Sequence, residues 1–182
     1  MKLSPKRKAR LLQTLRVPRP FTETADHMAA RMEVLLEEFH RVPEWGGFTP
    51  FLHTYLLITK AVARDRSSFN HPADLDWLDT HFASLYFRPL ERFLFSGKLT
   101  KPWATYYTYC SQPNGSAFVQ MLLGINAHIN GDLARTLQMA SYTRRADFLR
   151  VNHILEGEIP RVMRYLAFQQ KDPIAMGGLL WK

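Results

Sequence analysis

Apolar residues recur along this chain at helical spacing, every three or four positions, over most of its length. A strand with one buried face would instead alternate apolar and polar residues, and no segment does so. The pattern therefore predicts an all-α fold. With 182 residues, of which 46% are hydrophobic, the chain has the size and apolar content of one domain with a single core.

Capping residues, glycines and prolines divide this pattern into about six helices. We expect them at about residues 22–41, 49–65, 74–95, 102–110, 116–140 and 144–170. Pro89 and Pro160 fall inside the third and the sixth helix and predict a kink in each. The fifth helix is apolar on almost all sides, which is typical of a helix enclosed by others. The sequence thus predicts a single-domain helical bundle around a buried central helix.

Seven Lys and Arg residues precede the first acidic residue, Glu23, and the chain after residue 19 has a net charge of only about +1, against +8 for the whole. We interpret residues 1–20 as a basic N-terminal arm and residues 21–182 as the single helical domain. A frayed, solvated terminus is the simplest interpretation of the arm. Weak contact with an anionic surface is the alternative, and we expect no specific nucleic-acid binding.

No apolar segment is long enough to cross a membrane, and the arm lacks the apolar stretch of a secretory signal. We therefore expect a cytoplasmic protein without a transmembrane segment. The single cysteine, Cys110, excludes an intrachain disulfide and a Cys-x-x-Cys metal site. The oligomeric state does not follow from the sequence.

Polar residues interrupt the apolar stripes of three predicted helices. Asn126 and Asn130 project onto the stripe of the fifth helix, Asp79 onto that of the third, and Asn152 onto that of the sixth. A buried amide or carboxylate without a partner costs about 1–3 kcal/mol. We therefore expect these side chains to converge in the interior. Both a ligand pocket and a closed hydrogen-bond network that sets helix register fit this pattern.

His128 and Asp132 lie four residues apart on a second side of the fifth helix, where an imidazole and a carboxylate can meet within one turn. Such a pair suits a carboxylate-oriented acid or base, or half of a metal site. If a divalent metal binds there, the ligands fit zinc, iron or manganese and do not select among them.

The run Leu122–Leu133, LLGINAHINGDL, resembles the signature of an uncharacterised family of all-helical bacterial and fungal proteins, catalogued as a domain of unknown function. The segments 75–86 and 147–155, and Trp103 before the central helix, are similar to the same family. The resemblance covers about residues 48–166 and implies an all-α fold without an established activity. It points to Asp79, Asn126, His128, Asn130, Asp132, Asp147 and Asn152.

This chain departs from that family pattern next to Asp132. We expect a bulkier residue than Gly131 before the aspartate, and a proline instead of Ala134 after the following leucine. A more distant likeness is to zinc-dependent phospholipase C and nuclease proteins, which place His-x-x-x-Asp on a buried helix. Those proteins need further His and carboxylate ligands, and a matching N-terminal ligand is absent from this sequence.

We therefore predict an interior polar pocket for a small, partly hydrophobic molecule, and we favour an enzyme over a noncatalytic protein. The predicted catalytic residues are His128, Asp132 and Asp79, and His128 and Asp132 are the predicted ligands if a metal binds. The predicted substrate-binding residues are Asn126, Asn130, Asn152, His81, Tyr86 and Trp103. The alternative is a noncatalytic helical scaffold or interaction protein whose polar cluster is structural.

Overall fold

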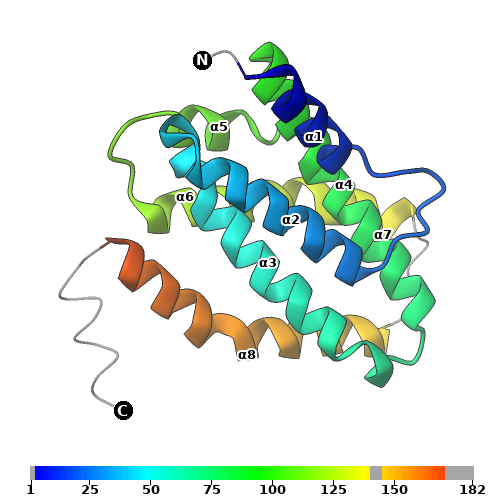
Figure 1. Cartoon of the computed structure of the whole chain (residues 1–182). Helices are drawn as coiled ribbons and strands as arrows, with labels where there is room; N and C mark the ends of the chain where they lie inside the picture. Colours follow the sequence, from blue (N-terminus) through cyan, green and yellow to red (C-terminus); the bar gives the residue numbers. More distant parts are fainter. Residues whose placement is uncertain (1–2, 140–144, 171–182) are drawn as a thin grey trace.

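The computed structural model describes residues 3–139 and 145–170, and every regular element within these ranges is a helix. The elements are α1 (Pro5–Leu15), α2 (Ala25–His40), η1 (Pro43–Phe48), α3 (Thr49–Arg64), η2 (Arg66–Ser68), α4 (Pro72–Ser96), α5 (Ala104–Cys110), α6 (Ala117–Asn126), η3 (Ala127–Leu133), α7 (Ala134–Met139) and α8 (Arg145–Gln170) (Figure 1). The predicted all-α, single-domain fold is confirmed. In this part of the chain, no helix combines the length and apolarity that a bilayer crossing needs.

Local signals account for several helix ends. Prolines occupy the first turn of α1, α3 and α4, where the missing N–H has no helical partner to lose. Gly97 ends α4 in the left-handed conformation, with φ of 66°. The six predicted helices correspond to α2, α3, α4, α5, the α6–η3–α7 run and α8. Both α4 and α8 continue through their internal prolines, Pro89 and Pro160.

The enclosed helix of the bundle is α3, which has α2 on one side and α8 on the other and also packs against α6 (Figure 1). The fifth predicted helix is not central, because Phe118, Leu122 and Ile129 on α6 and η3 are 40–43% exposed. The contact side of that run instead includes the small residues Gly124 and Ala127. The apolar residues on all sides of this helix therefore predicted more burial than the structure shows.

Aromatic side chains dominate the main core. Its largest fully buried members are Trp103, Tyr86, Tyr106, Tyr107, Phe39, Phe48 and Phe87. Phe51 of α3 joins several of them, with ring centroids 5.1 Å from Tyr86 and 5.6 Å from Trp103. Packed aromatic pairs of this kind add stability beyond the area that they bury. The result is a densely packed wall at one side of the candidate site.

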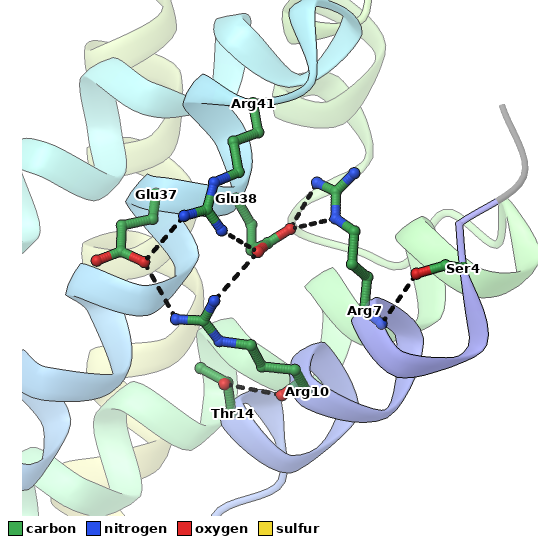
Figure 2. A network of polar contacts seen from close by, with 7 residues as sticks. All are labelled: Ser4, Arg7, Arg10, Thr14, Glu37, Glu38 and Arg41. Atoms are coloured by element: carbon green, nitrogen blue, oxygen red, sulfur yellow. Dashed lines mark hydrogen bonds and ion pairs between the residues drawn. The ribbon is translucent and has the colours of Figure 1, made fainter.

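Residues 5–15 form a helix packed onto α2 and α4, so the expectation of a frayed N-terminus is wrong for this segment. Leu11 and Leu15, one turn apart, are fully buried in the main core. On the same helix, the Arg7 guanidinium donates two hydrogen bonds to Oε2 of the buried Glu38, at 2.8 and 2.6 Å (Figure 2). This attachment gives no local signal in the sequence, because the acidic partners of the basic residues lie some thirty positions away, on α2.

Candidate functional site

A cavity of about 360 Å³ lies between α3, α4, the α6–η3 run and the first half of α8. Its apolar lining consists of Phe51, Tyr55, Ile58, Val62, Leu75, Leu78, Phe82, Ile125, Ile129, Leu133, Phe148, Val151 and Leu155. The other lining residues are Thr54, Asp79, His128 and Asn152. An apolar hollow with a few polar groups is the usual form of a small-molecule site, and this volume is near the lower end for such sites.

The polar centre of the cavity comes from η3, which is a π-helix. Short π-helical segments within α-helices occur often at functional sites. Glycines bring this run close to its neighbours: a Cβ on Gly124 would lie 2.3 Å from the Phe51 ring, and one on Gly131 would lie 2.0 Å from Pro102. The close approach of Pro102 explains why Gly131 stands where the family pattern led us to expect a bulkier residue.

His128 and Asp132 form a buried pair within η3. His128 Nδ1 lies 3.1 Å from Asp132 Oδ2, and Trp103 Nε1 donates to the same oxygen at 3.0 Å. Because a carboxylate only accepts, we assign the imidazole proton to Nδ1, which leaves the lone pair on Nε2. Nε2 is buried and has no hydrogen-bond partner among the described residues. This is the arrangement of a histidine base oriented by a carboxylate.

Aromatic rings fix the plane of this imidazole. The Phe82 ring stacks on it, with centroids 3.5 Å apart and an angle of 8°, and Tyr55 packs against it at 4.8 Å. Burial lowers the pKa of His128, although the bond to Asp132 acts in the opposite direction. The neutral imidazole is therefore favoured at pH 7, which leaves its Nε2 lone pair able to accept a proton.

Asp79 is the second titratable group of the cavity and lies one turn before Phe82 on α4. Burial raises the pKa of Asp79 to about 7, and the nearby charge of Asp76 acts in the same direction. At neutral pH, Asp79 is therefore protonated in a large fraction of the molecules, and its carboxyl group can then donate a hydrogen bond. Within residues 3–139 and 145–170, its buried Oδ2 has no hydrogen-bond partner.

Four of the predicted site residues gather at this cavity. Asp79, His128 and Asn152 line it, and Asp132 holds His128 from within η3. Trp103 and Tyr86 are fully buried in the adjoining wall and are not part of the lining. Trp103 acts on the site through its hydrogen bond to Asp132. The Tyr86 ring centroid lies 6.2 Å from that of His128.

The expected inward placement of Asn126 and Asn130 is wrong. Both are exposed and lie outside the cavity, where Asn130 Nδ2 donates to Asn126 Oδ1 at 2.8 Å. The predicted apolar stripe of this helix was defined by large residues such as Leu122, and Leu122 lies on the exposed side of the helix. The buried side carries Gly124 and Ala127, whose small side chains contribute little to an apolar stripe.

His81 is buried but also lies outside the cavity lining. Its ring stacks on Trp77, with centroids 5.1 Å apart, and packs edge-on against Phe21. Two residues along an α-helix turn a side chain by about 200°, so His81 points away from the face of α4 that carries Asp79. The prediction that His81 contributes to the pocket is therefore wrong.

Two hydroxyl groups at the cavity, those of Thr54 and Tyr55 on α3, were not among the predicted site residues. Both oxygens are buried and lack a hydrogen-bond partner within the part of the chain that the structure describes. In the sequence, Tyr55 follows the apolar spacing of its helix, and only its hydroxyl group distinguishes it from the neighbouring hydrophobic residues. The stacking of Phe82 on His128 had no signal in the sequence.

Asp147, to which the family resemblance pointed, secures the first turn of α8. It accepts hydrogen bonds from the backbone N–H groups of Asn70 and His71, at 2.9 and 3.1 Å, and lies 3.0 Å from His71 Nδ1. Burial acts to raise the pKa of Asp147, but these hydrogen bonds bring it below its ordinary value. The contact places the neighbouring Phe148 against the cavity.

A metal centre is not preformed at this site. Among the described residues, no group of three or more His, Cys, Asp or Glu side chains is arranged to hold a metal ion. The two predicted ligands, His128 and Asp132, are hydrogen-bonded to each other through Nδ1 and Oδ2.

The fold and the site define the class of this protein: a single-domain, all-helical protein with a buried His–Asp pair beside an apolar cavity. Residues 25–175 match DUF5995, a family of unknown function, and the chain belongs to that family. This confirms the resemblance to an uncharacterised all-helical family. No curated protein and no solved structure matched the chain.

Proposed function

We propose that this protein binds a small, largely apolar molecule in the cavity between α3, α4, η3 and α8, and that His128 exchanges a proton with that molecule. The observation that carries the proposal is the buried Nε2 of a cavity-lining histidine, for which the described residues offer no partner. Leaving such an atom unpaired costs about 1–3 kcal/mol. A group retained at this cost, in a cavity, is a candidate functional group.

Four residues then have distinct roles in general acid–base catalysis. Neutral His128 accepts a proton at Nε2, while Asp132 holds Nδ1 and stabilises the imidazolium that forms. Trp103 keeps the Asp132 carboxylate in place. Asp79, in its protonated form, donates a proton within the same cavity. The apolar walls limit access of water and strengthen each of these interactions.

The alternative, a noncatalytic scaffold with a sealed polar cluster, predicts close packing around the polar residues. Protein interiors without a binding role contain few voids larger than a water molecule. A cavity of about 360 Å³ beside His128 is therefore an argument for the pocket.

Binding can be tested with naphthalene, an uncharged and fluorescent apolar probe, and a variant that fills the cavity. We expect saturable one-to-one binding, and an affinity lower by about tenfold or more in Leu155→Trp, because residue 155 lines the cavity. Leu149→Trp is the matched control, since Leu149 lies on the same helix and is 46% exposed. Equal binding by wild type and Leu155→Trp would contradict the proposed site.

The proton-transfer role can be tested by ¹⁵N NMR of labelled histidine. We expect His128 to be neutral at pH 7, with its proton on Nδ1. Asp132→Asn should move the proton to Nε2, because an amide N–H can donate to Nδ1. A wild-type proton on Nε2 would contradict the assignment of His128 as a base, whatever the result of the naphthalene titration.

A further inference from the structure

The residues around the cavity indicate which kind of molecule it can accept. Among the lining residues that the structure describes, none is Lys or Arg. The groups that can carry charge are the carboxyl group of Asp79, a potential anion, and His128, whose neutral form is favoured by burial. Burying a charge without a partner is far more costly than burying a neutral polar group. A ligand with a carboxylate or phosphate would therefore find no permanent positive charge here.

The size of the cavity sets a second limit. A non-hydrogen atom occupies about 30 Å³, the share of a water molecule in the liquid, so 360 Å³ has room for roughly a dozen of them. Aliphatic and aromatic side chains surround most of this space. The body of the ligand is therefore a hydrocarbon chain or ring system of up to about ten carbons.

The polar groups of the cavity require a partner that both donates and accepts. With the proton on Nδ1, His128 Nε2 can only accept, so the ligand must offer a donor. Protonated Asp79 can donate, and the hydroxyl groups of Thr54 and Tyr55 can donate or accept, so a ligand that also accepts can satisfy them. A hydroxyl group satisfies both requirements without bringing a charge into the cavity.

We infer that the ligand is an uncharged hydroxyl compound with a hydrocarbon body of up to about ten carbons, whose O–H donates to His128 Nε2. This inference rests on the proposed function and specifies its substrate class. Ground-state binding needs only the hydrogen bond from the ligand to Nε2. In a proton transfer, the hydroxyl proton would move to Nε2 and the O–H electron pair would stay on the ligand oxygen; the resulting oxyanion would form an ion pair with the imidazolium, which Asp132 stabilises from Nδ1.

Calorimetric titration of the full chain with four naphthalene derivatives tests the inference, because they share one ring system. They are naphthalene, 2-naphthol, 2-naphthoate and 2-naphthylmethylammonium. At pH 7 we expect 2-naphthol to bind at least about tenfold more tightly than each of the others, the effect of one hydrogen bond to a buried acceptor. His128→Phe, which keeps an aromatic ring on Phe82, should remove the advantage of 2-naphthol over naphthalene.

Should His128→Phe fail to fold, the wild-type protein provides the same test. The ¹⁵N resonance of His128 Nε2 should shift with 2-naphthol and stay in place with naphthalene. Equal affinity for naphthalene and 2-naphthol would overturn the hydroxyl assignment and leave cavity binding intact. Tightest binding of the carboxylate or of the ammonium compound would also overturn it. If none of the four binds, or if binding survives Leu155→Trp, the proposed function itself fails.

Discussion

One carboxylate oxygen, Oδ2 of Asp132, connects two parts of the molecule that are distant in sequence. It accepts hydrogen bonds from Trp103, which precedes α5, and from His128 in its own helix. Because both donors are buried, a shift of either one leaves the other with a poorer partner. The orientation of the imidazole therefore depends on the aromatic core as well as on η3.

The raised pKa of Asp79 predicts a cost in stability at neutral and alkaline pH. An unfolded chain ionises this carboxyl group near pH 3.8, whereas the folded protein does so at about 7. The folded state thus holds an extra proton between these values, so the contribution of Asp79 to stability falls as pH rises through that interval. We expect Asp79→Asn to be more stable than wild type by about 1–3 kcal/mol at pH 8, with little difference at pH 4.

Urea unfolding at the two pH values measures this difference. Asp76→Asn is the matched control, because Asp76 lies on the same helix and accepts hydrogen bonds from Arg66 at 2.6–3.2 Å. That substitution should lower stability at pH 8. A destabilised Asp79→Asn at pH 8 would show that the carboxylate has a favourable partner in solution.

Two glycines on helices offer a comparison of close packing with open space. A Cβ on Gly124 would lie 2.3–2.6 Å from atoms of Phe51, whereas one on Gly157 would meet nothing within 4 Å. We expect Gly124→Ala to destabilise the fold by about 1–3 kcal/mol through overpacking. Gly157→Ala should stabilise it by about 0.5–1 kcal/mol, through helix propensity alone. Thermal unfolding of both variants checks the prediction, and equal effects would contradict the packing described here.

At the scale of elements, helix positions were predictable because spacing and capping are local properties. The boundaries of α2, α3 and α4 follow from Thr24, Pro50 and Gly97 or their neighbours. The buried side of the α6–η3 run was only partly predictable. His128 and Asp132 were correctly placed on one side, but Asn126 and Asn130 were not, since the contact side is formed by glycine and alanine.

The first half of α8 forms one wall of the cavity, and Asp147 secures its first turn to Asn70 and His71. The second half packs through Val162 and Leu166 against Met121. We expect Asp147→Asn to raise hydrogen exchange about tenfold in residues 147–155, because it weakens charge-assisted bonds to two backbone amides. Exchange around Val162 should stay unchanged.

Mass spectrometry of peptides from both halves of α8 resolves this difference. Glu156→Gln is the control, since Glu156 is exposed on the same helix. An even increase of exchange along the whole of α8 in Asp147→Asn would contradict a local role for this carboxylate.

At the scale of the whole molecule, the attachment of α1 depends on Glu38. This buried carboxylate interacts with Arg7, Arg10 and Arg41, and Glu37 beside it interacts with Arg10 and Arg41 at the surface (Figure 2). Burial acts to raise the pKa of Glu38, but the arginines bring it below its ordinary value. The stability that Glu38 provides is therefore complete above pH 4.5 and is lost as pH falls through the lowered pKa.

We expect Glu38→Gln to destabilise the protein by about 1–3 kcal/mol at pH 7, because it leaves three guanidinium groups without their shared anion. It should also speed trypsin cleavage within α1. Glu37→Gln, whose parent side chain is 54% exposed, should change stability by less than about 1 kcal/mol. Denaturant unfolding and timed proteolysis of the two variants check this, and equal losses would contradict a special role for Glu38.

The docking of α1 could not be predicted from the sequence, for a reason that applies to the whole molecule. Positive charge in the first twenty residues is visible in the sequence, but its neutralisation depends on Glu38, some thirty residues further on.

The cavity was partly predictable, because some of its polar residues can be recognised within a single segment of sequence. Asp79, His128 and Asn152 are polar residues in apolar surroundings, a contrast that a single segment reveals, whereas Thr54 and Tyr55 give no such contrast.

The π-helical winding of η3 makes the number of residues in this segment as important as their chemistry. Removing one residue from 127–133 would allow the remainder to continue as an ordinary α-helix, with its backbone hydrogen bonds restored. Side chains on either side of the deletion would then be turned by about 100° relative to each other. A one-codon deletion between His128 and Asp132 would therefore shorten their separation from four residues to three and turn the two side chains relative to each other, so the present geometry of the pair depends on the length of this segment.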